Sequence, residues 1–327
     1  MQVVPVNEYL TRDERKLLMQ KNDFLAWKDI ILHYIWIVGA FALVHFFPNI
    51  FTVIISLFVI GGKQLACAIL MHDTGHHAVF TNKKLNDFVG QWLGGYPIFN
   101  NLLAYRDYHF KHHQLTGLEE DPDLLLTRGY PTSRMSMIRK FIRDFIGITG
   151  VKALLGITIM NLGYIEYNMG GKIVKVSKEN RSFLYHLKCF RDNLLGPIIA
   201  NLIMFSVLWF FASPWLYLLW IGAYLTTFQF CIRVRSIAEH SVVEDTTNPY
   251  LNTRTTKANW LAKMLFAPYH VNYHAEHHML MSVPSYRLPK MHKILVEKGF
   301  YEKGVLAKGY WSIIKMASAQ KQRKIKT

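Results

Sequence analysis

Histidine is the residue type whose spacing in this chain points most directly to chemistry. Nine of the fifteen histidines fall in three short clusters, at 72–77, 109–113 and 274–278, where a uniform scatter would place fewer than one. Within each cluster, histidines three or four residues apart lie on one face of an α-helix. Imidazoles at that spacing suit a metal ion, so the clusters predict a metal site. The clustered residues are His72, His76, His77, His109, His112, His113, His274, His277 and His278.

The ligand type narrows the choice of metal. No cysteine lies near the clusters, which disfavours thiolate zinc and iron–sulfur sites. A catalytic zinc ion takes three protein ligands and a water, so nine imidazoles are too many for one zinc. Two metal ions held mainly by neutral nitrogen ligands remain. Iron is the first choice because the clusters adjoin apolar stretches, described next, that indicate a membrane. The useful chemistry at a membrane is the oxidation of hydrocarbon, which demands activated oxygen.

The elements that must position the clusters are long apolar stretches. Residues 30–47, 51–71, 194–211 and 214–232 are uncharged or nearly so, and crossing a bilayer takes about 20 residues. Short turns join them into two hairpins. Five lysines and arginines precede the first stretch and sixteen follow the last one, whereas the turns hold none. Since basic residues stay on the cytoplasmic side, both termini and all three clusters are expected there, with the turns outside.

Two further apolar stretches do not fit as spans. Residues 88–105 are interrupted by glycine and asparagine, and residues 145–165 carry Lys152. We expect both to be interfacial or re-entrant helices. Lys63 lies inside the second span, and we expect its long side chain to reach the headgroup region.

The predicted fold class is all-α. It is an integral membrane protein with four transmembrane helices in two hairpins, interfacial helices, and a cytoplasmic helical cap that carries the histidine clusters. Residues 1–327 are expected to form a single domain with its core at 30–292. Residues 1–29 form a cytoplasmic arm, and residues 293–327 form a basic cytoplasmic tail that ends in a frayed run of charges.

Composition excludes other classes of protein. A net charge of +16 beside 51% hydrophobic residues indicates either a nucleic-acid binder with a large core or a membrane protein with a basic cytoplasmic face. The basic residues are spread over all cytoplasmic segments and not gathered on one helix, so no nucleic-acid partner is expected. Three cysteines cannot pair off completely, which rules out a disulfide scaffold.

The order and flanks of the three clusters resemble those of the membrane fatty acid desaturases and their hydroxylase relatives. The similar segments are His109-Phe-Lys-His-His with Glu120-Asp-Pro-Asp after it, and Asn272-Tyr-His-Ala-Glu-His-His. The resemblance covers most of the chain. It implies a centre of two iron ions, O2 as the oxidant, two electrons from an external donor, and an acyl chain in a kinked tunnel.

The resemblance also implies which residues bind metal and take part in catalysis. Eight histidines match its pattern as catalytic ligands: His72, His76, His109, His112, His113, His274, His277 and His278. His77 is a further candidate ligand, although structural support is nearly as good an interpretation, because His72 and His76 already fill one helix face. His240 is the tenth candidate, since the family often has one more ligand after the fourth span. A capping or hydrogen-bonding role is the alternative for His240.

Carboxylates near the clusters are expected to orient the ligands. A metal-bound histidine usually donates its other ring N–H to a carboxylate or carbonyl. We expect one or two members of the acidic run to do this, with Asp73 and Glu276 as candidates for the same role. The run consists of Glu119, Glu120, Asp121 and Asp123.

The predicted activity is that of a membrane-bound, O2-dependent acyl desaturase, an oxidoreductase of fatty acid biosynthesis. It would introduce a C=C bond into an acyl-lipid, acyl-CoA or acyl-ACP substrate. The alternative is a related hydroxylase or ketolase acting on a carotenoid, alkane or sphingolipid. Electrons would come from a separate ferredoxin, rubredoxin or cytochrome b5-type donor, because no His-Pro-Gly-Gly motif of a fused cytochrome b5 domain occurs. A bacterial inner membrane is favoured over the endoplasmic reticulum.

Overall fold

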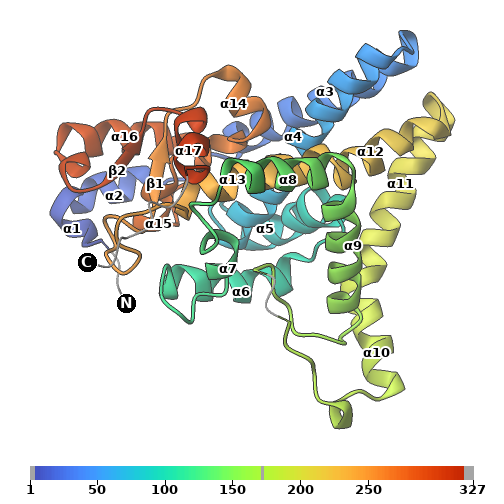
Figure 1. Cartoon of the computed structure of the whole chain (residues 1–327), viewed down its shortest axis with the longest axis horizontal. Coiled ribbons are helices and arrows are strands. Elements are labelled where there is room, and N and C mark those ends of the chain that lie inside the picture. The colour runs from blue at the N-terminus through green and yellow to red at the C-terminus, as the bar shows by residue number, and fades with distance from the viewer. Residues whose placement is uncertain (1–3, 171–172, 320–327) are drawn as a thin grey trace.

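Four long apolar helices form the frame of the protein, as the sequence predicts. The computed structural model describes residues 4–170 and 173–319 (Figure 1). The helices that are long and apolar enough to cross a membrane are Asp23–Phe46, Ile50–Gly75, Phe183–Phe211 and Pro214–His240. The chain is therefore an integral membrane protein. The second and fourth helices extend beyond the predicted spans to candidate ligands, since the second runs through His72 to Gly75 and the fourth ends at His240. The first and third begin seven and eleven residues before the predicted spans.

The first two long helices are α3 (Asp23–Phe46) and α4 (Ile50–Gly75). The third is continuous through α10 (Phe183–Cys189), η4 (Phe190–Leu194) and α11 (Leu195–Phe211). The fourth comprises η5 (Pro214–Leu216), α12 (Tyr217–Leu225) and α13 (Thr227–His240). The tips of both hairpins lie at the same end of the molecule in Figure 1, far from the cap. Asn49 sets the first turn, since its side chain accepts hydrogen bonds from the backbone N–H groups of Phe51 and Thr52.

Helix α4 lies at the centre of the frame. Two thirds of its most apolar window is buried, against 17% for the third long helix, whose sides face outward. Gly61 and Gly62 make this close packing possible: a Cβ on Gly61 would collide with Thr227 of α13, and one on Gly62 with the carbonyl oxygen of Met264. The segments that contain Thr227 and Met264 therefore both pack closely against α4 at these two adjacent glycines.

The cap consists of short helices around the end of α4. It holds α5 (Lys83–Val89), η1 (Gly90–Gly95), η2 (Tyr96–Ile98), α6 (Leu102–Leu115), α7 (Leu124–Thr127), α8 (Arg134–Phe145), α9 (Ile148–Asn161), α14 (Trp260–Leu265), η6 (Pro268–His270), α15 (His274–Met279), η7 (Ser285–Arg287), α16 (Leu288–Glu297), η8 (Phe300–Glu302) and α17 (Tyr310–Ala317). The short helix η3 (Lys178–Asn180) precedes the third long helix. Residues 88–105 and 145–165 form no helix of spanning length; glycine and proline break the former into α5, η1 and η2.

A small sheet departs from the purely helical prediction. Strand β1 (Arg254–Thr256) pairs in parallel with β2 (Val305–Ala307), with Arg254 opposite Val305. Each strand has three residues, too few for the alternating pattern that reveals a strand in a sequence.

The N-terminal arm and the C-terminal segment pack on each other. Helices α1 (Val6–Tyr9) and α2 (Arg12–Leu18) lie against α16 and η8. The rings of Tyr9 and Phe300 meet edge to face, with centroids 5.3 Å apart, and Lys298 Nζ lies 2.5 Å from a Glu14 carboxylate oxygen. This cluster also includes Ala275 and Met279 of α15, so both chain ends support the third histidine helix. Residues 320–327, the end of the predicted basic tail, lie outside the described residues.

Candidate metal centre

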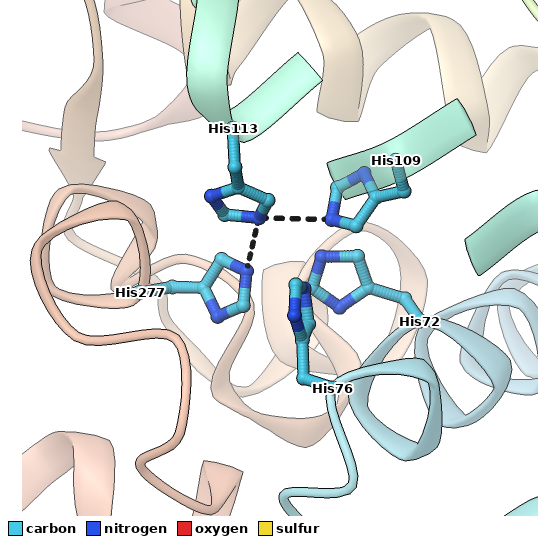
Figure 2. A group of neighbouring side chains, drawn as sticks. All are labelled: His72, His76, His109, His113 and His277. Atoms are coloured by element: carbon cyan, nitrogen blue, oxygen red, sulfur yellow. Dashed lines mark hydrogen bonds between the residues drawn. The ribbon is translucent and has the colours of Figure 1, made fainter. Parts of the chain in front are cut away.

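Nine of the ten candidate ligands meet in two groups, each with its ligand nitrogens within 4.8 Å of one another. The first group is drawn in Figure 2, where five imidazoles from three separate segments face a common centre. It consists of His72, His76, His109, His113 and His277. The second group consists of His112, His240, His274 and His278. His240 thus lies among the cluster histidines.

The helical spacing within the second and third clusters explains how each of them contributes to both groups. On α6, His109 and His113 are four residues apart and face the first group, while His112 points to the second. On α15 the arrangement is opposite: His274 and His278, four residues apart, belong to the second group, and His277 belongs to the first. The end of α4 supplies only the first group. Helix α13 ends at His240, which completes the second.

The ring nitrogens within each group lie at short distances from one another. In the first group, His113 Nε2 is 2.9 Å from His109 Nε2 and 3.1 Å from His277 Nε2 (Figure 2). In the second, His274 Nε2 is 2.8 Å from His240 Nε2 and 3.1 Å from His278 Nε2. Imidazole nitrogens converge in this way where their lone pairs share one cation.

The chemistry of these side chains fits a metal ion. Among the described residues, His72 Nε2 and both ring nitrogens of His76 are buried without a hydrogen-bond partner. A buried polar atom left unpaired is costly, and a metal ion would satisfy His72 Nε2 and one of the two His76 nitrogens. Burial lowers the pKa of His76 to about 3 and also lowers the pKa values of His109 and His277. These imidazoles are therefore neutral, as metal ligation requires.

Oxygen atoms behind the ligands fix their orientation. His72 Nδ1 lies 2.7 Å from Asp73 Oδ1, and His112 Nδ1 lies 2.8 Å from Asp121 Oδ1. In both cases the Nδ1–H donates to the carboxylate and the Nε2 lone pair turns toward the cluster. Burial disfavours charge on His112, but the bond to Asp121 outweighs it and raises the His112 pKa. Asp73 and Asp121 therefore occupy the positions expected of orienting carboxylates.

Other carboxylates of the predicted set have different partners. Glu276 is fully buried but accepts hydrogen bonds from Thr255, Tyr301 and His292, so it braces α15 and orients no cluster imidazole. Asp123 accepts from Tyr108, and its other oxygen lies 3.7 Å from His112 Nδ1, behind the closer Asp121. Glu119 pairs with Arg128 at the surface. The expectation that Glu276 holds a ligand was wrong, because its position on α15 turns it away from both groups.

Three oxygen-bearing groups that lie close to Nδ1 atoms of the second group were not predicted from the sequence. His240 Nδ1 lies 3.1 Å from the carbonyl oxygen of Asn252, and His278 Nδ1 lies 3.3 Å from Thr116 Oγ1. Glu239 lies 3.6 Å from His274 Nδ1 and is held by Arg235. Of the three, only Glu239 could have been found from the sequence, because it lies four residues after Arg235, at ion-pair spacing on a helix, and directly before His240.

His77 lies outside both groups. The helix ends at Gly75, and His77 has a left-handed backbone with φ of 51°. Its Nε2 is 3.0 Å from Asp87 Oδ1, and the same carboxylate pairs with Arg106. Of the two interpretations left open for His77, this geometry favours structural support, since it ties the end of α4 to α5.

An apolar cavity of about 440 Å³ lies between α9, α12 and α13. Ala68 and Ser236 line it, and each is one helical turn before a metal-site histidine, His72 and His240 respectively. Aliphatic and aromatic side chains form most of the remaining wall, and its polar groups include Asn100 and Gln229 as well as the cations Lys152 and Arg233. The cavity therefore approaches the histidine groups from the side of the long helices.

Comparison with known proteins agrees with this geometry. A sequence profile of the family described as fatty acid desaturase matches residues 44–311, which include all ten candidate ligands. The chain is also similar to dihydrorhizobitoxine desaturase from Bradyrhizobium elkanii. The two are 28% identical over 256 residues, which cover 76% of this chain and 69% of that protein.

Proposed function

The chain belongs to the fatty acid desaturase family, and on that premise we propose that it is a membrane-bound, O2-dependent desaturase that introduces a C=C bond into an acyl chain. The observation that carries the proposal is the position of the apolar cavity, one helical turn from two groups of buried imidazoles. A metal site built only for storage would need no such cavity.

Each histidine group would hold one iron ion. His72, His76, His109, His113 and His277 form the five-nitrogen site, and His112, His240, His274 and His278 form the four-nitrogen site. Iron bound there supplies the O2 activation that cleavage of an unactivated C–H bond requires. The second group would hold its ion with one protein ligand fewer than the first.

The side chains have three tasks in such a reaction. Asp73 and Asp121 hold the imidazole N–H groups of two ligands so that their Nε2 atoms stay aimed at the metals. Burial of His109 and His112 keeps bulk water from the site. Ala68 and Ser236 line the cavity one helical turn before His72 and His240, and they would help to place one pair of methylene groups for reaction.

The overall reaction requires an external reductant. A –CH2–CH2– unit gives up two hydrogens, and O2 takes them together with two electrons and two protons to form two waters. Donors of the ferredoxin, rubredoxin or cytochrome b5 type supply single electrons of this kind. The metal site and both chain ends lie on the cytoplasmic face in this proposal, in a bacterial inner membrane, where such a donor can dock.

The substrate is proposed to be an acyl chain carried by a lipid, CoA or acyl carrier protein. The predominantly apolar wall of the cavity supports a hydrocarbon. A second candidate is dihydrorhizobitoxine, which the name of the similar Bradyrhizobium elkanii protein gives as its substrate.

Expression in a host that lacks the activity tests the proposal, with mass spectrometry of total fatty acids and of products from added dihydrorhizobitoxine. We expect a new monounsaturated acyl product with the wild type and none with His112→Ala. A hydroxylated or keto product would instead establish the alternative hydroxylase or ketolase, and conversion of dihydrorhizobitoxine alone would exclude an acyl substrate.

A further inference from the structure

Lys63 is a buried lysine that the metal site does not use. It lies on α4 between the central glycines and the histidines, and only 8% of its surface is exposed. The nearest aromatic ring is that of Trp36, 5.8 Å from Nζ. Within residues 4–170 and 173–319 it forms no ion pair with a carboxylate. A buried ammonium group is costly without an anion, so this position calls for a partner.

Lys63 lines a pocket of about 230 Å³ that is separate from the apolar cavity. The pocket lies between α3 and α4 of the frame and α14 and η6 of the cap. Lys263 is an exposed second cation at its wall, and Asp29 is its one lining carboxylate. Leu32 and Trp36 line the same pocket and are about half exposed on the outer face of α3. The pocket is therefore open toward the bilayer and cationic inside.

The pocket wall also carries polar atoms without partners. His33 Nδ1, Tyr269 Oη and His270 Nδ1 are buried and form no hydrogen bond within the described chain. His33 itself is 4% exposed. Burial lowers the pKa of His270 to about 4, so that ring is neutral and offers hydrogen bonds without charge. The positive charge of the pocket thus comes from its two lysines.

The backbone of the cap is strained where it forms this wall. Tyr269 and His270 both have left-handed φ values, 49° and 59°, which a bulky side chain adopts only when its surroundings hold it there. They precede His274 by five and four residues, respectively. A ligand in the pocket would therefore brace the segment that leads directly into the third histidine helix.

We propose that this pocket binds the phosphate of an anionic phospholipid, with the acyl chains lying along Leu32 and Trp36. Two lysines and one aspartate leave a net charge of +1, which one phosphate neutralises. Basic pockets at the junction of transmembrane helices and cytoplasmic segments suit lipid headgroups in this way. The pocket is distinct from both histidine groups, so the lipid would bind whatever reaction the metals perform.

Titration of the purified full-length protein with lipids of matched acyl chains, read by native mass spectrometry, tests this site. Phosphatidylglycerol is the anionic probe, and phosphatidylcholine and phosphatidylethanolamine are the zwitterionic ones. We expect wild type to bind phosphatidylglycerol most tightly. Because one basic residue near a headgroup contributes about 1 kcal/mol, Lys63→Gln should weaken that binding about fivefold. Asp29→Asn should strengthen it, and Lys188→Gln, which removes an exposed lysine of α10, should leave it unchanged.

Several results would overturn the proposal. Equal binding of phosphatidylglycerol and phosphatidylcholine by wild type would do so, as would equal effects of Lys63→Gln and Lys188→Gln. Preference for phosphatidylethanolamine, weakened by Asp29→Asn, would show that Asp29 binds an amine headgroup instead. Displacement by inorganic phosphate alone would indicate a site for free anions. If Lys63→Gln does not fold, Lys263→Gln at the exposed wall makes the same comparison.

Discussion

Asp121 Oδ1 lies 2.8 Å from Nδ1 of His112, and the second oxygen of the same carboxylate accepts the backbone N–H of Gly117 at 2.9 Å. The carboxylate therefore joins α6 to the loop that follows it and fixes the ring of a proposed ligand. It is 8% exposed, whereas its neighbour Glu120 is at the surface. Substitution of Asp121 therefore tests the orienting role, and substitution of the neighbouring Glu120 is the matched control.

Asp121→Asn is expected to lower the iron affinity of the four-nitrogen site, because the amide is a weaker acceptor for the His112 N–H. Loss of such an outer hydrogen bond typically costs about 10–100-fold in metal affinity or activity. Iron content after dialysis against a chelator series measures the change. Glu120→Gln should behave as wild type, and equal iron retention by the two variants would contradict the role of Asp121.

His240→Ala is expected to remove iron from the four-nitrogen site and to leave less than about a tenth of the wild-type turnover, a loss of at least 1.4 kcal/mol of transition-state stabilisation. His240 Nε2 lies within the second group, 2.8 Å from His274 Nε2. His186 Nδ1 is instead hydrogen-bonded to the Leu162 carbonyl oxygen, far along the chain from any cluster. His186→Ala should keep its iron. Metal content and turnover are measured for both variants, and equal iron content in the two would show that His240 is not a ligand.

His77→Ala is expected to retain the full iron content, since its ring contacts Asp87 and neither group of ligands. Arg106 also pairs with Asp87, so the tie between α6 and α5 survives the substitution. His76→Ala, one residue earlier, should lose iron. If both variants lose iron to the same extent, His77 is a ligand after all.

Asp144→Ala is expected to destabilise the protein by roughly 3–5 kcal/mol, because it would leave a charged partner unpaired in a buried setting. Asp144 is fully buried and accepts two hydrogen bonds from Arg233, at 2.5 and 2.7 Å, which join α8 to α13. Unfolding by sodium dodecyl sulfate in mixed micelles measures the loss. Glu119→Gln breaks an exposed pair with Arg128 and should change little.

Cysteines placed at Asn49 and Ser213 are expected to react with an impermeant thiol reagent from outside intact cells, since both lie in the hairpin turns. A cysteine at Arg128 should not react until the cells are opened. Cys189 is the native thiol with partial exposure, so a Cys189→Ser background removes its signal. Labelling at position 128 from outside would overturn the proposed orientation.

Residue patterns were sufficient to predict the frame and the gathering of the histidines, because both depend on local periodicity. Apolar length indicates a long helix, and i,i+4 spacing indicates a shared helix face. The division of the second and third clusters between two groups was not predictable in this way. His112 and His113 are adjacent, and which of them faces which group depends on how α6 lies against α13 and α15.

The same limit applies to what supports the ligands. Asp121 stood out because it lies in a local acidic run, but the carbonyl of Asn252 and the hydroxyl of Thr116 carry no distinctive signal. The orienting role predicted for Glu276 was wrong because a position next to the ligands in the sequence does not determine which way a side chain points from a short helix. Lys63 was expected to reach the headgroup region by its length alone; no residue pattern indicated the pocket beside α14 that its buried side chain lines, where we propose that a lipid phosphate binds.

The division of the second and third clusters between two groups has a consequence for assembly. His113 and His277 are 164 residues apart in the chain, yet their nitrogens meet in one group. A metal ion there closes a very long loop, as a disulfide bond would, and closing such a loop removes much of the freedom of the unfolded chain. The second ion would close a similar loop through His112 and His274. Iron bound in both groups would thus cross-link the chain twice as well as take part in the reaction, and metal starvation should leave the first and last thirds of the cap free to separate.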